Sequence, residues 1–96
     1  MPRIVYSQRA SQDLFRLHQF LAEKNPAAAL RAITTIRDSI DSLQHMPKMG
    51  RPVENGLREW IIDFSSSGYV ALYDLHEITD ELVVLAVKHQ RDDDYV

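Results

Sequence analysis

Apolar residues recur at helical spacing in the first quarter of the chain. The stripe, with intervals of four, three and four residues, consists of Ala10, Leu14, Leu17 and Leu21. It predicts an amphipathic helix from about residue 9 to residue 24, with polar side chains such as Asp13 turned to solvent. The short apolar run Ile4–Tyr6 predicts a strand before this helix, and Ser7 is a suitable helix N-cap.

The pair Asn25-Pro26 marks the start of a second predicted helix. Asparagine can accept hydrogen bonds from the free N–H groups of a first turn, and proline fits the first helical position. The apolar face that follows consists of Leu30, Ile33, Ile36, Ile40 and Leu43. Pro47 and Gly50 should end the helix. Because almost no residues separate the two helices, we expect them to fold back on each other as a hairpin.

The second half of the chain has the pattern of strands. After a predicted loop at residues 46–56, Trp60, Ile62 and Phe64 alternate with more polar positions, as in a half-buried strand. Two further strands are predicted at Tyr69–Leu75 and Leu82–Val87, separated from each other and from the first by turns at residues 65–68 and 79–81. The last of them is apolar on both faces, which predicts a central strand.

The predicted order of elements is β-α-α-β-β-β. It indicates a single α+β domain over residues 1–96, with an antiparallel-dominated sheet. The helical hairpin should pack on one face of this sheet, since a helical stripe and a sheet face bury each other. The other face would stay partly open, and a functional site could lie there.

Composition excludes several classes of protein. The chain has 45% hydrophobic and 26% charged residues, which is typical of soluble globular proteins. It has no apolar run near the roughly 20 residues that cross a bilayer, and no signal-peptide core at its start. Without cysteine it has no disulfide or cysteine-based zinc site, so a cytoplasmic location is expected. The net charge of −3 argues against broad affinity for nucleic acid.

The order of these elements and motifs resembles the RelE/ParE toxin superfamily of type II toxin–antitoxin modules. The matching motifs are Gly50-Arg51-Pro52, Leu57-Arg58-Glu59, Gly68-Tyr69 with a strand ending at Tyr73, and Val87-Lys88-His89-Gln90-Arg91. The resemblance implies a toxin of a plasmid-stabilisation module, neutralised in a hetero-oligomer by a cognate antitoxin. It also implies one of two targets: mRNA on the ribosome, cleaved by the RelE branch, or DNA gyrase, inhibited by the ParE branch.

Polar positions on the strands favour the ParE branch. Cleavage of RNA requires a base, an acid and cations around the reacting phosphate. The resemblance implies that a nuclease of this family carries Lys and Arg on the strand before the Ser-Gly turn and Arg directly after Gly-Tyr. This chain has Ile61, Asp63 and Ser65 at the first positions and Val70 at the second. A gyrase inhibitor without catalytic residues is therefore favoured.

Two alternatives stay open. One is a ribosome-dependent mRNA endonuclease, whose candidate catalytic residues are His89, Arg91 and Tyr95. The other is an inactive toxin fold that only binds its antitoxin.

The expected target-binding residues are all basic. They are Arg51, Arg58, Lys88, His89 and Arg91. Arg58 could equally be a surface charge or an ion-pair partner of the helices, and His89 could hydrogen-bond locally to fix the C-terminal segment. The run Asp92–Asp94 is interpreted as a solvated tail, because three consecutive side chains point in different directions. We expect no metal and no cofactor.

Overall fold

The computed structural model describes residues 1–64, 67–92 and 95. The elements are β1 (Arg3–Tyr6), α1 (Gln8–Ala22), α2 (Pro26–Asp41), the 3-10 turn η1 (Ser42–Gln44), β2 (Arg51–Pro52), the 3-10 turn η2 (Glu54–Gly56), β3 (Arg58–Phe64), β4 (Ser67–His76) and β5 (Glu81–His89). Ser65 and Ser66, in the predicted turn before β4, lie outside the described residues.

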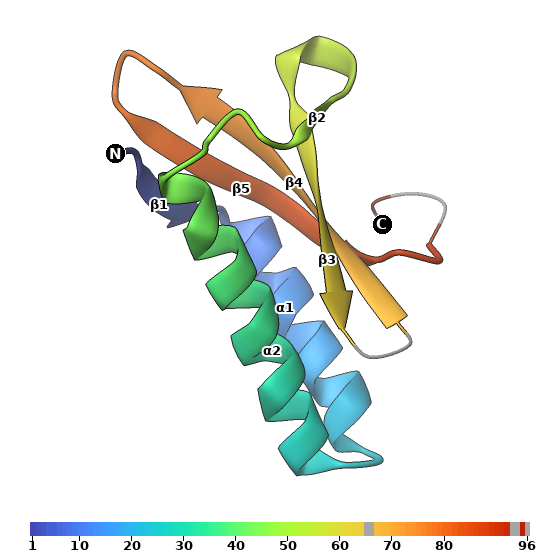
Figure 1. The fold of residues 1–96 in the computed structure, drawn as a ribbon. Coiled ribbons are helices and arrows are strands. Elements are labelled where there is room, and N and C mark those ends of the chain that lie inside the picture. The colour runs from blue at the N-terminus through green and yellow to red at the C-terminus, as the bar shows by residue number, and fades with distance from the viewer. Residues whose placement is uncertain (65–66, 93–94, 96) are drawn as a thin grey trace.

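The strands form one five-stranded sheet in the order β1-β5-β4-β3-β2. Only the β1–β5 pair is parallel, and the other three pairs are antiparallel. Both helices lie side by side on one face of this sheet (Figure 1). The predicted α+β class and the helical hairpin are therefore confirmed.

Two details of the predicted sheet were wrong. The strand predicted at Leu82–Val87 belongs to β5, which is interior but is not the middle strand. β4 holds the middle position, because β1 pairs with one side of β5 and the short β2 extends the opposite edge. The segment 46–56, predicted as a loop, contains β2 and η2. A strand as short as β2 leaves no alternating pattern for sequence analysis to detect.

Both predicted helix N-caps are confirmed. Ser7 Oγ accepts a hydrogen bond from the Ala10 N–H at 3.0 Å, and Asn25 Oδ1 accepts one from the Ala28 N–H at 3.1 Å. Each bond satisfies one of the N–H groups that the first turn of a helix leaves free. The first helix ends at Ala22 instead of Lys24. None of the helices in the described ranges is long and apolar enough to cross a membrane.

The buried face of α2 is rotated from the predicted one at its N-terminal end. Leu30, predicted to be buried, is 62% exposed, whereas Ala29 and Ala32 are fully buried. Small side chains let two helix backbones approach closely, and α2 turns these alanines inward where it packs beside α1. From Ile36 onward the predicted and observed faces coincide.

The core lies between the hairpin and the sheet. Its buried members are Ala10, Leu14, Ile36, Ile40, Leu43, Ile62, Tyr69, Ala71, Tyr73, Leu82, Val84 and Val87. Trp60 and Phe64 pack against this cluster. The strand aromatics are therefore part of the core, as the pattern predicted.

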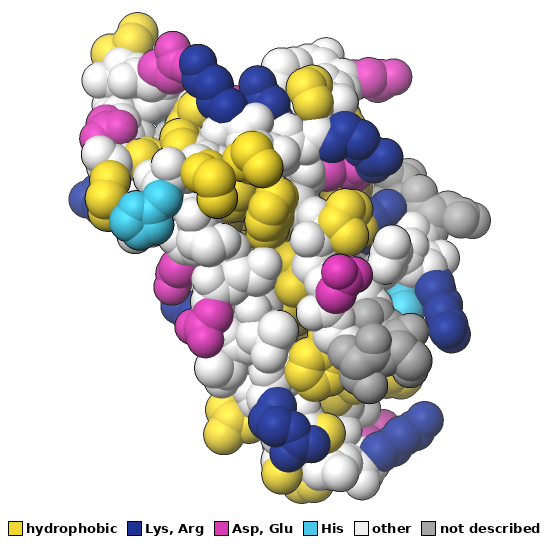
Figure 2. Space-filling model, in the orientation of Figure 1, with side chains coloured by type: hydrophobic (Ala, Val, Ile, Leu, Met, Phe, Trp, Pro, Cys, Tyr) yellow, Lys and Arg dark blue, Asp and Glu magenta, His cyan; other side chains and the backbone are white. Residues whose placement is uncertain are grey.

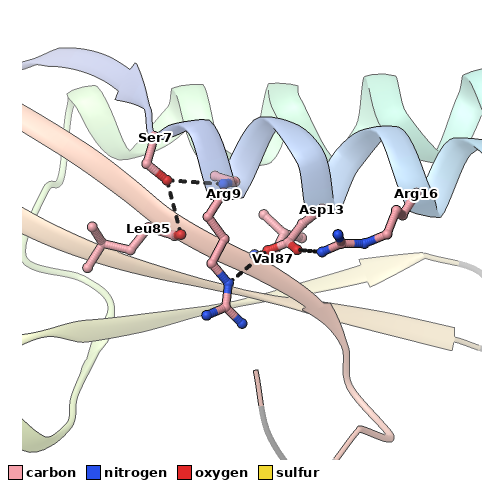
Figure 3. A network of polar contacts seen from close by, with 7 residues as sticks. Ser7, Arg9, Asp13, Arg16, Leu85 and Val87 are labelled. Atoms are coloured by element: carbon pink, nitrogen blue, oxygen red, sulfur yellow. Dashed lines mark hydrogen bonds and ion pairs between the residues drawn. The ribbon is translucent and has the colours of Figure 1, made fainter. Parts of the chain in front are cut away.

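Asp13 was predicted to face solvent, and this was wrong, because it is buried beside β5. β1 ends at Tyr6, whereas β5 continues to His89, so the last part of β5 has no strand on that side. Asp13 Oδ2 accepts the Val87 N–H at 2.9 Å (Figure 3). Side chains of α1 and its cap thus replace the missing strand, since Ser7 Oγ also donates to the Leu85 carbonyl at 3.1 Å.

Two arginines on α1 offset the charge of Asp13. Arg16 forms an ion pair with Asp13 Oδ1, and Arg9 Nε lies 3.9 Å from Oδ2 (Figure 3). A buried carboxylate is costly unless it is paired and hydrogen-bonded. Both conditions are met, because Arg9 and Arg16 lie four and three residues from Asp13 on the same helix and reach its carboxylate.

Candidate functional site

A cluster of polar side chains covers part of the sheet face opposite the helices. Glu59 from β3 forms an ion pair with Arg51 from β2. Tyr95 donates its hydroxyl hydrogen to Glu59 Oε2 at 2.7 Å, and Lys88 Nζ from β5 lies 4.6 Å from the centre of the Tyr95 ring. We call Arg51, Glu59, Lys88 and Tyr95 the open-face cluster. It joins β2, β3 and β5 to the C-terminal segment.

Contacts within the open-face cluster shift the pKa values of Glu59 and Tyr95 in opposite directions. Partial burial disfavours the charged form of Glu59, but hydrogen bonds from Arg51 and Tyr95 and the charges of Arg51 and Lys88 outweigh it and lower the Glu59 pKa. The pKa of Tyr95 is raised by burial, by its hydrogen bond to Glu59 and by the charge of that carboxylate. These effects favour the protonated form of Tyr95, which donates its hydroxyl hydrogen to Glu59.

Arg58 anchors the loop that carries Arg51. Its guanidinium donates to the carbonyl oxygens of Lys48 at 3.0 Å and Gly50 at 2.8 Å. The fully buried Tyr73 supports the same loop from below, since its hydroxyl accepts the Gly50 N–H at 2.9 Å and donates to the Pro47 carbonyl at 2.7 Å. Segment 47–50 is therefore fixed by four hydrogen bonds to two side chains. Sequence analysis did not assign Tyr73 this role.

The fixed loop presents apolar side chains to solvent. Met46 is 51% exposed and Met49 is 57% exposed, and with Pro47 they line an open hollow. Figure 2 shows hydrophobic side chains gathered over this loop. Methionine side chains adapt to irregular partner surfaces, and exposed apolar patches are typical of binding sites. Sequence analysis missed this patch, because its only signals were two methionines among loop residues.

His89 and Arg91 lie in a groove on the other side of β5. The groove has a volume of about 670 Å³ and lies between this end of the sheet and α1, with Leu17, Phe20 and Lys24 on its helical wall. His89 Nδ1 accepts the Arg91 N–H at 3.0 Å, and the His89 ring meets Tyr69 edge to face at 5.4 Å. These contacts fit the interpretation that His89 fixes the C-terminal segment.

The structure separates the candidate nuclease residues. His89 and Arg91 line the groove beside α1, whereas Tyr95 belongs to the open-face cluster and lines a different hollow with Glu59 and Leu72. Lys88 and His89 are adjacent in β5, and adjacent strand residues point to opposite faces. Lys88 therefore joins the open-face cluster, and His89 joins the groove.

The described part of the chain contains no group of three His, Asp or Glu side chains placed to hold a metal ion. Asp92 lines the groove beside α1, and Asp93 and Asp94 lie outside the described residues.

The sequence profile described as "ParE toxin of type II toxin-antitoxin system, parDE" matches residues 4–94. This match covers almost all of the chain. The chain belongs to the ParE toxin family. Its curated relatives carry the name of the other branch of the superfamily. Toxin RelE3 of Caulobacter vibrioides is 30% identical over 89 residues, covering 93% of this chain and 95% of that protein. Toxin RelE1 of the same organism is 39% identical over 72 residues, covering 75% and 77%.

Solved structures agree with the ParE-family fold. A chain of the chromosomal ParDE system of P. aeruginosa superposes with a TM-score of 0.77 at 22% identity, covering 93% of this chain and 96% of the other. A chain of the RelBE2 toxin–antitoxin complex of Mycobacterium tuberculosis superposes with a TM-score of 0.60 at 19% identity, covering 94% and 100%. The profile match and the curated relatives identify a RelE/ParE-superfamily type II toxin, and these solved structures show the same fold.

In this ParE-family chain, the positions where a nuclease should carry cations have other side chains. Ile61 is 40% exposed, Asp63 is exposed and Val70 is buried. Ser65 lies outside the described residues. Lys88 lies opposite Val70 in the sheet, Arg51 lies opposite Glu59, and both cations are engaged in the open-face cluster.

Proposed function

We propose that this toxin acts in the cytoplasm by binding and inhibiting DNA gyrase and does not cleave RNA. The observation that supports this most directly is the chemistry of the open sheet face, where Asp63 supplies an exposed carboxylate and Ile61 an exposed aliphatic group in place of Lys or Arg. A phosphate in a cleavage transition state gains negative charge, which a carboxylate at this position would repel. Such a face can contact a protein, but it does not stabilise the transition state for RNA cleavage.

The state of Tyr95 supports binding without catalysis. A tyrosine acting as the base for a ribose hydroxyl must lose its proton near neutral pH. The raised pKa of Tyr95 and its donated hydrogen bond to Glu59 oppose that loss. His89 and Arg91, the other residues of the nuclease hypothesis, lie in a separate groove.

The proposed target surface combines the Arg51 loop with the open face. Met46 and Met49 provide apolar contact on this loop, Arg51 provides positive charge directly after it, and Lys88 provides positive charge on the open face. Apolar anchors with a charged rim are typical of protein–protein interfaces. The ion pair with Glu59 holds Arg51 in one position, and this reduces the entropy that binding would cost.

The alternative function is ribosome-dependent cleavage of mRNA. It is supported by the names of the relatives, toxins RelE1 and RelE3, and by the cations Lys88 and Arg91 near the C-terminus. In this alternative His89 would take part in proton transfer. In the proposed function its substitution affects only local structure.

A paired assay separates the two functions. The purified chain is added to a gyrase supercoiling reaction and, separately, to a translation reaction in which mRNA cleavage at the ribosomal A site is mapped. The proposal predicts inhibited supercoiling, with trapped cleavage complexes and intact mRNA. The sequence alone suggested His89 and Arg91 as target-binding residues, but both line the groove beside α1 and lie outside the proposed target surface. The double variant His89→Ala/Arg91→Ala should therefore inhibit gyrase like the wild type. Cleaved mRNA that disappears in this variant, with unaffected gyrase, would establish the nuclease.

A cellular test addresses the toxin–antitoxin role. Induction of the chain alone should arrest bacterial growth with a DNA-damage response, and co-expression of the cognate antitoxin should restore growth. Normal growth upon induction would favour an inactive toxin fold that only binds its antitoxin. Loss of a plasmid upon deletion of the gene pair would test the stabilisation role.

A further inference from the structure

Sulfur is the element of this chain that oxidants attack most readily. The chain has no cysteine, so all of its sulfur belongs to the three methionines Met1, Met46 and Met49. Each of these residues is more than half exposed. An oxidant in solution can therefore reach all three side chains in the folded protein, and exposure is what makes a thioether susceptible.

Met46 and Met49 lie at the two ends of one tight turn. The Met49 N–H donates to the Met46 carbonyl at 3.1 Å, and both side chains line an apolar hollow of about 340 Å³ (Figure 2). Hydrogen bonds to the side chains of Tyr73 and Arg58 fix segment 47–50 beneath this hollow. None of these four bonds involves a sulfur atom. Oxidation of the two methionines therefore changes the chemistry of the surface while the bonds that hold its backbone remain.

We propose that Met46 and Met49 form a reversible oxidation site, and that hydrogen peroxide inactivates the toxin by converting both to sulfoxides. The inference rests on the proposed function, because these residues belong to the surface proposed to bind gyrase. In each reaction the Sγ lone pair attacks one oxygen of the peroxide, the O–O bond breaks and an S–O bond forms. The thioether loses two electrons, and the other peroxide oxygen leaves as water.

A sulfoxide lacks the apolar character that this surface offers to a protein target. Its oxygen is a hydrogen-bond acceptor, and binding would bury that oxygen among apolar groups. The complex would then lose the apolar contact of each methionine and would also bury a polar group without a partner. For both methionines together, we expect the affinity for gyrase to fall by about tenfold or more.

The loop is the part of the proposed target surface where peroxide acts. The apolar residue on the open face is Ile61, and its aliphatic side chain does not react with peroxide. The charged residues Arg51 and Lys88 are equally inert to it. A loss of binding after treatment is therefore expected to come from Met46 and Met49.

The test treats the purified full chain with hydrogen peroxide, removes the peroxide with catalase and then adds gyrase. Peptide mass spectrometry measures the sulfoxide content of each methionine. When Met46 and Met49 are fully converted, the toxin concentration that halves supercoiling should rise by about tenfold or more. Treatment with the two methionine sulfoxide reductases, one for each sulfoxide epimer, should restore the original inhibition.

Two double variants serve as controls. Met46→Leu/Met49→Leu keeps apolar side chains of similar volume that cannot be oxidised, so peroxide should leave its inhibition equal to that of its own untreated sample. Met1 is still present in this variant, and the comparison thus separates the loop from the N-terminus. Met46→Gln/Met49→Gln places polar side chains at both positions and should inhibit as weakly as the oxidised wild type, without peroxide.

Circular dichroism distinguishes a change of surface from unfolding. The oxidised chain should melt within about 2–3 °C of the untreated chain, and a larger fall in Tm would overturn the proposal by assigning the loss to stability. Unchanged inhibition by a chain with sulfoxides at both Met46 and Met49 would also overturn it, as would a loss that the reductases do not reverse. An untreated chain that leaves supercoiling unaffected would instead refute the proposed inhibition of gyrase itself.

Discussion

Replacing Tyr73 by phenylalanine removes one oxygen atom from the base of the Arg51 loop. The ring is fully buried and keeps its shape, so the change affects only the two hydrogen bonds of the hydroxyl. The Gly50 N–H loses its acceptor at 2.9 Å, and the Pro47 carbonyl loses its donor at 2.7 Å. Arg58 still holds the Lys48 and Gly50 carbonyls.

The expected loss of stability follows from the burial of the two groups. A buried N–H left without an acceptor costs about 1–3 kcal/mol. The Pro47 carbonyl is only partly buried, so water recovers part of its bond. We expect Tyr73→Phe to lower the free energy of unfolding by about 2–3 kcal/mol. For a domain of this length, that corresponds to a fall in Tm of roughly 10–20 °C.

Thermal denaturation followed by circular dichroism measures this change, and Tyr69→Phe is the matched control. Tyr69 is also buried on β4, but within the described ranges its hydroxyl has no hydrogen-bond partner. Its substitution should change the unfolding free energy by less than about 0.5 kcal/mol. If the two variants melt within 2–3 °C of each other (about 0.5 kcal/mol), the Tyr73 hydroxyl does not fix the loop.

Three further changes test other parts of the structure. Asp13→Ala leaves the Val87 N–H without its acceptor and should lower the free energy of unfolding, measured by urea denaturation, by about 2–3 kcal/mol. Asp13→Asn keeps an acceptor oxygen and should lower it by less than half as much, and equal losses would contradict the role of that hydrogen bond. Gly50→Ala would place its Cβ 2.6 Å from Tyr73 Cε1 and should cost about 1–3 kcal/mol, and a neutral urea midpoint would show that the loop can move away. Because the pKa of Glu59 is lowered in the folded state, its contribution is present above the unfolded pKa and is lost as pH falls through the folded one. As pH falls from about 5 to about 3, the free energy of unfolding should therefore decrease more for the wild type than for Glu59→Gln, by at most about 1 kcal/mol. Parallel plots of this free energy against pH for the two proteins would refute the role of Glu59.

Local patterns along the chain predicted most of the fold. The two caps at Ser7 and Asn25 depend on neighbouring residues, and both are confirmed at hydrogen-bond distance. The alternation of Trp60, Ile62 and Phe64 was similarly sufficient to identify the buried face of β3. Leu30 was misplaced because its size suggested burial, whereas close packing of two helices favoured the alanines beside it.

The candidate site was predictable only in part. Sequence analysis named Arg51, Lys88 and Tyr95, and these residues belong to the open-face cluster. It could not show that Tyr95 and His89 lie on opposite faces of the sheet, because the position of a tail residue depends on the path of the chain after β5. It also gave Arg58 a choice between a surface charge and an ion pair, whereas its guanidinium binds backbone carbonyls of the preceding loop.

The sequence by itself determined the order of elements and the membership of the ParE toxin family. It also determined that Ile61, Asp63 and Val70 stand where a nuclease of the family should carry Lys or Arg. Each depends on residue identity or on the spacing of near neighbours. Only the tertiary structure decided the partners of Asp13 and the free edge of β3, because both follow from strands of unequal length that lie side by side. Where β1 ends, Asp13 satisfies the peptide group of β5. Where β2 ends, no strand among the described residues pairs with the outer side of Ile61 and Asp63.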